Sequence, residues 1–432
     1  MSHRVADGSP ATDAVAEAED SKPLSTAEGH AAARIRSLDM LRGVGVLGML
    51  AVHIQIFAYP MLARLNPTAY GDFQGVNRWV WLATSLFADG KFIAIFAMLL
   101  GVSIVMLPRQ IAGPAIPAWR LHVTRMAALL VLGLAHAYLI WYGDMLVALA
   151  LCGTVVFFAR RLSPRWLLAL GGGAFTAGSA VTLVLALVLT HGPADRLEAW
   201  KDYYTPRLVN IVTEINQYQG TWADQMRHRV PTAREFHTSH FVSYLFWQMT
   251  GLMLLGMALF KLEVLTAARS RAFYLRMASL GFGAGALLIS LGLWRSFVMR
   301  WDLLDFALVG QQLHYWGNFL VALGWIALVM LFCQRGWQLR PVAAVGRMAL
   351  SNYLLQTLIC TTIFYGHGLG LFGQVDRAGQ FLIVLAVWTF QLLASSIWLS
   401  YFALGPVEWA LRWVIYGRRP GLLRSPLAVT EI

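Results

Sequence analysis

The sequence has few charged residues and few cysteines, and both shortages restrict the kinds of protein that it encodes. Charged residues make up 13% of the 432 positions and hydrophobic residues 58%, a composition that excludes an ordinary soluble domain and is typical of multi-pass membrane proteins. Cys152, Cys333 and Cys360 lie in apolar segments without paired spacing. We therefore expect no disulfide framework and no zinc site, and interpret the cysteines as small buried hydrophobic residues.

Nucleotide and metal motifs are also lacking. Gly171–Gly173 and Gly281–Gly285 lie inside apolar runs without a following Lys-Ser or Lys-Thr, so we expect glycines at helix contacts and no phosphate loop. The nearest approach to a metal motif is Glu235-Phe-His237-Thr-Ser-His240. A third and a fourth ligand are not apparent, and we predict no metal.

The first 33 residues contain no aromatic residue and no apolar run, so residues 1–33 are expected to form a disordered cytoplasmic tail. No cleavable signal peptide precedes the first apolar run, which we expect to be retained as an anchor. The net charge of +12 is spread over short loops between apolar runs. This pattern favours membrane lipids and anionic small molecules as partners over nucleic acid, and it leaves a homo-oligomer open.

Ten apolar runs are long enough to cross a bilayer, which predicts an all-α transmembrane bundle of about ten spans. They lie at 39–59, 80–107, 121–141, 143–160, 165–190, 241–261, 273–294, 313–333, 343–365 and 380–404. Alternate connections collect 22 Lys and Arg residues, whereas the opposite short loops hold five. The positive-inside rule therefore predicts that both termini are cytoplasmic.

Three domains follow from this arrangement: the tail 1–33, a transmembrane domain 34–404, and a cytoplasmic interfacial helix and tail 405–432. The long outer loop 191–240 interleaves aromatic residues with charges, which indicates interfacial helices over the outer face. Residues 405–419 have an aromatic and basic pattern suited to the inner interface. A plain surface anchor explains that last pattern equally well.

Histidines within apolar spans are the first candidate site residues. At the usual helical rise, His53 lies roughly 18 Å from the inner end of its span and His136 roughly 20 Å from the inner end of its own, so both belong to the outer half of the membrane. His240, His314 and His367 are expected on the same side, and Asp144 follows the His136 span in a short outward turn.

A carboxylate beside an imidazole can set its tautomer and raise its basicity. His53, His136 and Asp144 are therefore candidate catalytic residues that would deprotonate a hydroxyl or an amine. The alternative is that Asp144 caps a helix and that the neutral histidines fill polar gaps between helices.

Asp89 and Lys91 are charged residues in the middle of the second apolar run. Residues two apart do not face each other on a helix, so each needs a partner elsewhere, and Gly90 between them permits a break in the helix. Broken helices at membrane depth usually line a cavity. The alternative is that the helix begins only at Asp89 and that these charges lie at the outer interface.

Basic residues gather at the inner ends of the spans that carry these polar groups. Candidate cofactor-binding residues are Arg36, Arg42, Arg125 and Arg347, with Arg340 nearby. Arginine forks match phosphate oxygens, so these residues would hold the phosphates of an acyl-CoA, although anchoring alone explains part of the set. Asn352 would line the path between the two sites, whereas hydrogen bonding between helices is the commoner role of such a residue.

Several motifs occur in an order that resembles the YeiB family of bacterial inner-membrane proteins, over residues 34–420. They are Leu38-Asp39-Met-Leu-Arg42-Gly43, Gly90-Lys91-Phe92 with Leu100-Gly101, His136 with Gly143-Asp144, Gly346-Arg347 through Ser351-Asn352-Tyr353, Phe364-Tyr365-Gly366, Gly405-Pro406-Val-Glu408-Trp409 and Tyr416-Gly417-Arg418. The family is similar to transmembrane acyltransferases such as heparan-alpha-glucosaminide N-acetyltransferase, which take acetyl groups from cytosolic acetyl-CoA.

The resemblance implies a membrane acyltransferase that moves an acyl group, expected to be acetyl, from cytosolic acetyl-CoA or another acyl-CoA to a hydroxyl or amine at the outer face. The acceptor would be a glycan, a lipid or a metabolite. His136, oriented by Asp144, is then the expected general base, and His53 a second base or oxyanion donor. Two alternatives remain: a transporter or flippase of a lipid-like molecule, and a sensory subunit without chemistry.

Overall fold

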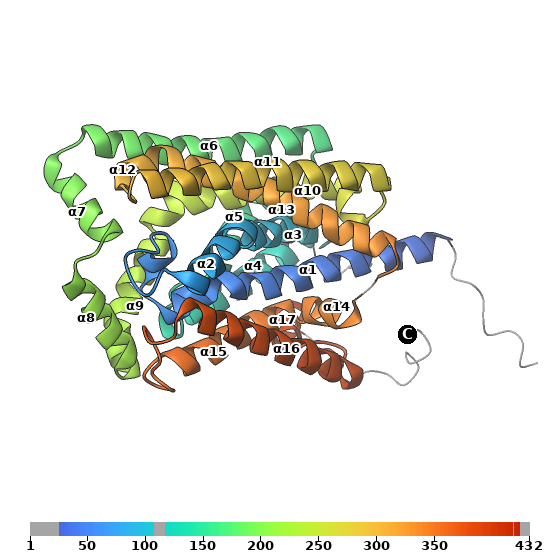
Figure 1. Ribbon diagram of the computed structural model, residues 1–432. Coiled ribbons are helices and arrows are strands. Elements are labelled where there is room, and N and C mark those ends of the chain that lie inside the picture. Colours follow the sequence, from blue (N-terminus) through green and yellow to red (C-terminus); the bar gives the residue numbers. More distant parts are fainter. Residues whose placement is uncertain (1–25, 108–116, 338, 418, 424–432) are drawn as a thin grey trace, which may run out of the picture.

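The computed structural model describes residues 26–107, 117–337, 339–417 and 419–423. Helices dominate these residues, and they contain no strand beyond one isolated antiparallel bridge between Phe402 and Leu423. The prediction of an all-α bundle is therefore confirmed. Figure 1 shows most of the helices running side by side along one direction, with a group of shorter helices across one end.

Eight helical segments of the described residues are long and apolar enough to cross a membrane: Arg36–Ala58, Gly75–Met106, Ala118–Leu139, Pro164–His191, Trp222–Lys261, Arg271–Val298, Leu303–Gln334 and Arg377–Tyr401. They cover eight of the ten predicted spans. A chain with this many apolar helices is a multi-pass membrane protein.

Shorter helices occupy the other two predicted spans. The run 143–160 forms α5 (Leu146–Val156) and the 3₁₀ turn η3 (Phe157–Arg161). The run 343–365 forms α14 (Arg340–Arg347) and α15 (Ala349–Phe364), which are separated at Met348. Both lie alongside the long helices (Figure 1). Ten crossings and cytoplasmic termini therefore stay predictions.

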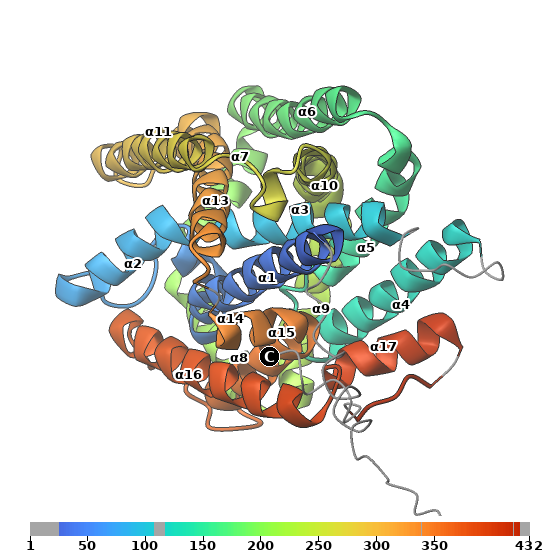
Figure 2. The ribbon, with the colours of Figure 1, turned by 90° about the vertical axis from the view of Figure 1, so that its right-hand side faces the viewer.

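Helix α1 (Thr26–Ala58) lies near the middle of the bundle, as the end-on view in Figure 2 shows. Its first eight residues, 26–33, fall within the predicted disordered tail. The alanine-rich stretch 27–33 has high helix propensity, which explains this extension of the apolar helix toward the N-terminus. Residues 1–25, the remainder of the predicted tail, lie outside the described residues.

The two ends of the bundle differ. Helices α7 (Ala194–Tyr204), α8 (Leu208–Gln219) and α9 (Trp222–His237) lie across one end, which we call the cap end (Figure 1, left). They correspond to the helices predicted in the loop 191–240. The first turns of α1 lie at the opposite end, which we call the terminal end (Figure 1). The last helix, α17 (Pro406–Tyr416), lies near this end, where Glu408 accepts the Leu350 N–H at the start of α15.

Glycines allow the closest helix contacts. The densest lies between α11 (Arg271–Val298) and α13 (Gln311–Gln334), where a Cβ on Gly281 would come within 2.6 Å of the Gly324 backbone nitrogen. Gly171 and Gly285 make similar approaches, whereas Gly172, Gly173 and Gly283 have nothing within 4 Å of a Cβ. Helix contact is thus the role of only some of the predicted glycines, because one face of a helix holds every third or fourth residue.

Candidate functional site

A buried carboxylate and a buried imidazole meet toward the cap end. His136 lies in the last turn of α4 (Ala118–Leu139), and Asp144 lies in the turn that leads into α5. Nδ1 of His136 donates to Oδ2 of Asp144 at 2.7 Å, and each residue is 1% exposed. Asp144 Oδ1 also accepts the Val147 N–H at 3.0 Å. Asp144 therefore holds the imidazole and the start of α5 together, which combines both roles considered for it.

Thr357 of α15 completes this group. Its hydroxyl lies 3.0 Å from Nε2 of His136, and the residue is 1% exposed. With the Nδ1 proton directed at Asp144, Nε2 accepts the Thr357 proton. The same hydroxyl has a second acceptor, the Tyr353 carbonyl at 3.4 Å, so it keeps a partner if it turns away from the imidazole. This contact was not predictable from the sequence, because 221 residues separate the two positions.

His53 of α1 lies beside the same aromatic residues as His136. Its ring centroid is 5.0 Å from that of Trp141 and 6.4 Å from that of Tyr353, while the corresponding distances from His136 are 6.3 and 5.3 Å. The structure thus brings His53, His136 and Asp144 together from separate helices. His53 is partly exposed although it lies in the second half of an apolar span, whereas His136 is buried.

The remaining histidines divide into two groups. His240 and His314 lie near a second charged group, described below, whereas His367 lies under the cap, with Nδ1 3.3 Å from Gln225 Oε1. His122 is structural: its Nε2 lies 3.0 Å from the Gly153 carbonyl, and its ring stacks on Phe157. The five histidines predicted on one side therefore lie in three places: His53 and His136 share one site, His240 and His314 lie near the second charged group, and His367 lies under the cap.

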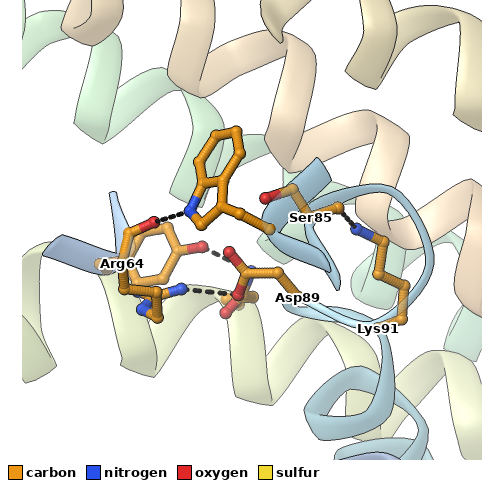
Figure 3. Close-up of polar contacts among 7 residues, drawn as sticks. Arg64, Ser85, Asp89 and Lys91 are labelled. Carbon is orange, nitrogen blue, oxygen red and sulfur yellow. Dashed lines mark hydrogen bonds and ion pairs between the residues drawn. The ribbon is translucent and has the colours of Figure 1, made fainter. Parts of the chain in front are cut away.

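The second charged group occupies a break between α2 (Gly75–Phe87) and α3 (Lys91–Met106). Gly90 at this break has φ 74°, so the predicted interruption of the helix is confirmed. Nη1 of Arg64 donates to Oδ1 of Asp89 at 2.6 Å, and the fully buried Lys91 ammonium donates to the Ser85 carbonyl (Figure 3).

His314 of α13 lies close enough to Lys91, Asp89 and Arg64 to interact with their charges electrostatically. His240 interacts in the same way with Arg64. We call Arg64, Asp89, Lys91, His240 and His314 the charge cluster. The charges of Arg64 and Asp89 also reach His53, which therefore lies between the cluster and the His136–Asp144 pair. Asp89 and Lys91 were predictable as site residues, but Arg64 was not, because two arginines follow the first span and nothing in their spacing distinguishes them.

Arginines gather at the terminal end, as predicted, but several have protein partners. Arg42 forms an ion pair with Asp39 at 2.7 Å, and Nη2 of Arg125 donates to Ser103 Oγ at 3.0 Å. Arg347 is exposed, and its guanidinium donates to the Ala403 carbonyl at 3.3 Å. The charges of Arg42 and Arg412 act on Arg125. Arg412 of α17 is thus a further member of this group, while Arg36 is exposed on the first turns of α1.

Asn352 does not line a path between the two ends. It is 2% exposed, and its amide donates to Ser395 Oγ at 2.9 Å and to the Val345 carbonyl at 3.3 Å. Gln356 and Gln391 form a similar pair one turn further on, at 2.9 Å. The predicted role of Asn352 beside a cofactor is therefore corrected to hydrogen bonding between α14, α15 and α16 (Arg377–Tyr401), which a buried amide needs in an apolar bundle.

Two other features bear on ligands. A surface hollow of about 420 Å³ at the terminal end is lined by Arg271, Leu331, Gln334 and Arg335, and by none of the histidines. Among the residues that the structure describes, no group of three His, Cys, Asp or Glu side chains is arranged to hold a metal ion. The Glu235–His240 segment is included in that statement.

The fold and the site define a multi-pass membrane protein with ionisable side chains from several helices buried between its cap and terminal ends. The family described as "Protein of unknown function (DUF418)" matches residues 259–418. The chain is 33% identical over 393 residues to the "Uncharacterized protein YeiB" of Escherichia coli (strain K12), covering 87% of this chain and 94% of the relative. It is 28% identical over 407 residues to the "Uncharacterized protein YxaH" of Bacillus subtilis (strain 168), covering 89% and 94%.

These similarities extend over nearly the whole of both relatives, so they are not confined to one motif or one domain. The chain belongs to the YeiB family. The resemblance noted from the order of its motifs is therefore confirmed.

Proposed function

We propose that this protein is an acyltransferase of the bacterial cytoplasmic membrane that moves an acyl group, expected to be acetyl, from a cytosolic acyl-CoA to a hydroxyl or amine at the outer face. In this proposal the terminal end faces the cytosol and the cap end faces outward, in agreement with the distribution of basic residues. The observation that carries the proposal is the buried Asp144–His136 pair beside the partly exposed His53.

His136 is the proposed general base. Asp144 fixes the proton on Nδ1, so Nε2 presents a lone pair, and that lone pair now faces the Thr357 hydroxyl. In the reaction an acceptor hydroxyl or amine takes the place of Thr357, whose hydroxyl turns to the Tyr353 carbonyl. His136 removes the acceptor proton as the acceptor attacks the thioester carbonyl, and the same proton then passes to the departing thiolate.

His53 and Trp141 are proposed to stabilise the oxyanion of that step. His53 is the accessible imidazole of the site, and the Trp141 indole N–H is buried without a hydrogen-bond partner among the described residues. A buried donor that faces developing negative charge is a large source of catalysis in a low-dielectric site.

The arginines at the terminal end are proposed to bind the phosphates of the donor. Arg42 pairs with Asp39, which Arg347 also approaches, and Arg125 lies near Arg42 and Arg412. Glu408 is a second carboxylate at this end, where it accepts the Leu350 N–H. Arg42 lies eleven residues before His53 on α1, which corresponds to about 17 Å of helix, so the donor would have to reach inward by that distance.

Equilibrium binding of radiolabelled acetyl-CoA to the purified full-length protein tests the proposal. We expect binding by the wild-type protein and at least tenfold weaker binding by Arg42→Ala and by Arg347→Ala. Arg276→Ala, which removes an exposed arginine of α11 at the same end, is the matched control and should bind normally. Absence of wild-type binding, or equal loss in all three variants, would contradict the proposed donor.

Transport of an amphipathic molecule is the second candidate, and the charged break between α2 and α3 favours it. Discontinuous helices with exposed ends near mid-membrane form the substrate sites of many transporters. A transporter would move its substrate across vesicle membranes without any acyl-CoA, which distinguishes it from the enzyme.

A further inference from the structure

The charge cluster carries more positive than negative charge. Arg64 and Lys91 are two cations, and Asp89 is the carboxylate that pairs with Arg64 and whose charge acts on Lys91. Among the described residues Lys91 forms no ion pair, and its ammonium donates to the neutral Ser85 carbonyl. An uncompensated cation in a low-dielectric interior costs several kcal/mol, so the cluster as it stands favours an added anion.

The backbone at the break adds donors to the same place. Helix α3 begins at Lys91, whose own N–H donates to the Ala88 carbonyl at 3.1 Å. The other N–H groups of a first helical turn have no partner within their own helix and lie at the positive end of its dipole. Helix N-termini beside a lysine and a glycine turn commonly bind phosphate. A Cβ on Gly90 would lie 2.6 Å from Asn318 Nδ2, so Asn318 of α13 closes the other side of the break.

Asn318, a half-buried residue, is the other polar side chain at the break. Its Oδ1 is buried and has no hydrogen-bond partner among the described residues. A buried acceptor without a donor is rare in folded proteins and needs an explanation.

Part of the charge cluster is not fully buried, although the cluster lies within the bundle. The side chains of Arg64 and Asp89 are 23% and 26% exposed, and His53, His240 and His314 are partly exposed. His240 precedes the π-helical turn η4 (Phe241–Leu245), and a second one, η6 (Phe306–Gly310), leads into α13 just before His314. Such turns occur frequently at functional sites.

We propose that the charge cluster binds the phosphate group of an amphipathic ligand, with Arg64 as the contacting cation and Lys91 as a buried charge behind it. The guanidinium fork of Arg64 matches phosphate oxygens, and Asp89 fixes its direction. In the proposed acyl transfer this ligand is the acyl acceptor, and its hydroxyl lies beside His53. That identification of the ligand rests on the proposed function. The binding itself does not depend on acyl transfer.

Equilibrium binding to the purified full-length protein in detergent tests this site with three probes. Dihexanoyl phosphatidic acid carries a phosphate on short acyl chains, inorganic phosphate lacks the chains, and dihexanoyl phosphatidylcholine lacks the net negative charge. We expect phosphatidic acid to bind at least tenfold more tightly than phosphatidylcholine. Tight binding of inorganic phosphate as well would identify a free phosphate as a ligand source, and its absence would identify a lipid headgroup.

Two variants that change the net charge of the cluster in opposite directions distinguish an electrostatic effect on binding from misfolding. Arg64→Gln should weaken phosphatidic acid binding at least tenfold, whereas Asp89→Asn increases the surplus positive charge and should strengthen it. Damage to the fold would weaken both. Arg78→Gln is the matched control, because Arg78 is exposed on α2 and packs over the Phe297 ring, outside the cluster.

Absence of wild-type binding to all probes, or equal binding by Arg64→Gln, would overturn the site and imply that Lys91 gives up its proton instead. The acetyl-CoA experiment reports separately on the proposed function. Phosphatidic acid binding without acetyl-CoA binding would support the phosphate site and contradict acyl transfer. Acetyl-CoA binding without phosphatidic acid binding would contradict the phosphate site and leave acyl transfer supported.

Discussion

Nδ1 of His136 and Oδ2 of Asp144 lie 2.7 Å apart, each on a side chain that bulk solvent barely reaches. A histidine held in this way has one defined tautomer and one available nitrogen. The second oxygen of Asp144 accepts the Val147 N–H, so the carboxylate is fixed from both sides. This pair connects the turn between α4 and α5 to α15, because Thr357 occupies the available nitrogen.

Asp144→Asn should lower acyl transfer by about 10²- to 10⁴-fold with little loss of stability. The amide oxygen still accepts the Val147 N–H, whereas the negative charge that supports the His136 tautomer is lost. Initial rates of transfer and the thermal unfolding temperature in detergent measure the two effects. Unchanged transfer would show that the pair is structural.

Thr357→Val should change transfer by less than about tenfold, because the proposed role of Thr357 is to give up its place to the acceptor. Valine has nearly the same shape and leaves Nε2 of His136 without its hydroxyl partner. The rate is compared with that of Thr357→Ser, which keeps the hydroxyl. A loss in the valine variant as large as that in Asp144→Asn, with full activity in the serine variant, would instead make Thr357 a reacting group.

Gly281→Ala should destabilise the protein by about 1–3 kcal/mol, since its methyl group would meet the Gly324 backbone where α11 packs on α13. Gly283→Ala is the control on the same helix, with nothing within 4 Å of the added Cβ. Alanine favours helix over glycine, so the control should be neutral or slightly stabilising. Thermal unfolding in detergent distinguishes the two, and equal shifts would contradict the packing of α11 on α13.

The folding stability of the protein is expected to depend on pH through Glu214 of α8, in the cap. Burial raises the pKa of its carboxyl from the ordinary 4.5 to about 7, and the hydrogen bond from the Met61 N–H partly opposes that rise. A carboxyl with a raised pKa binds its proton more tightly in the folded state. Its contribution to stability is therefore full below about pH 4.5 and is lost as the pH rises through about 7, by about 3 kcal/mol at most.

Glu214→Gln resembles the protonated carboxyl, so its unfolding temperature should fall less than that of the wild-type protein over this pH window. Glu198→Gln is the control, because Glu198 of α7 is exposed and pairs with Lys201 at 2.9 Å. Parallel curves for the wild-type protein and Glu214→Gln would show that Glu214 is not buried against the loop at Met61.

Much of the fold follows from hydropathy, because a span of about 20 apolar residues is a strong one-dimensional signal. The interruption at Gly90 was equally predictable, since Asp89 and Lys91 cannot both be satisfied on a continuous apolar helix. The separation of α14 from α15 at Met348 was not. It depends on the Glu408 carboxylate, which accepts the Leu350 N–H at 2.8 Å from 58 residues away.

Most residues of the candidate site were predictable from the sequence, but few of the contacts between them were. Asp144 is close to His136 in sequence, so a turn brings them together. The partners Thr357 and Arg64 depend on which helices are neighbours, and a single sequence does not contain that information. Asn352 shows the converse: an amide among apolar residues has the same pattern whether it faces a ligand or another helix.

Transfer from radiolabelled acetyl-CoA into inverted membrane vesicles of expressing cells, which carry their own acceptors, tests the central claim most directly. We expect vesicles with the wild-type protein to incorporate label and His136→Ala vesicles to incorporate at least 100-fold less, while purified His136→Ala binds acetyl-CoA as the wild-type protein does. Equal incorporation by both kinds of vesicle, or none above that of vesicles lacking the protein, would contradict it.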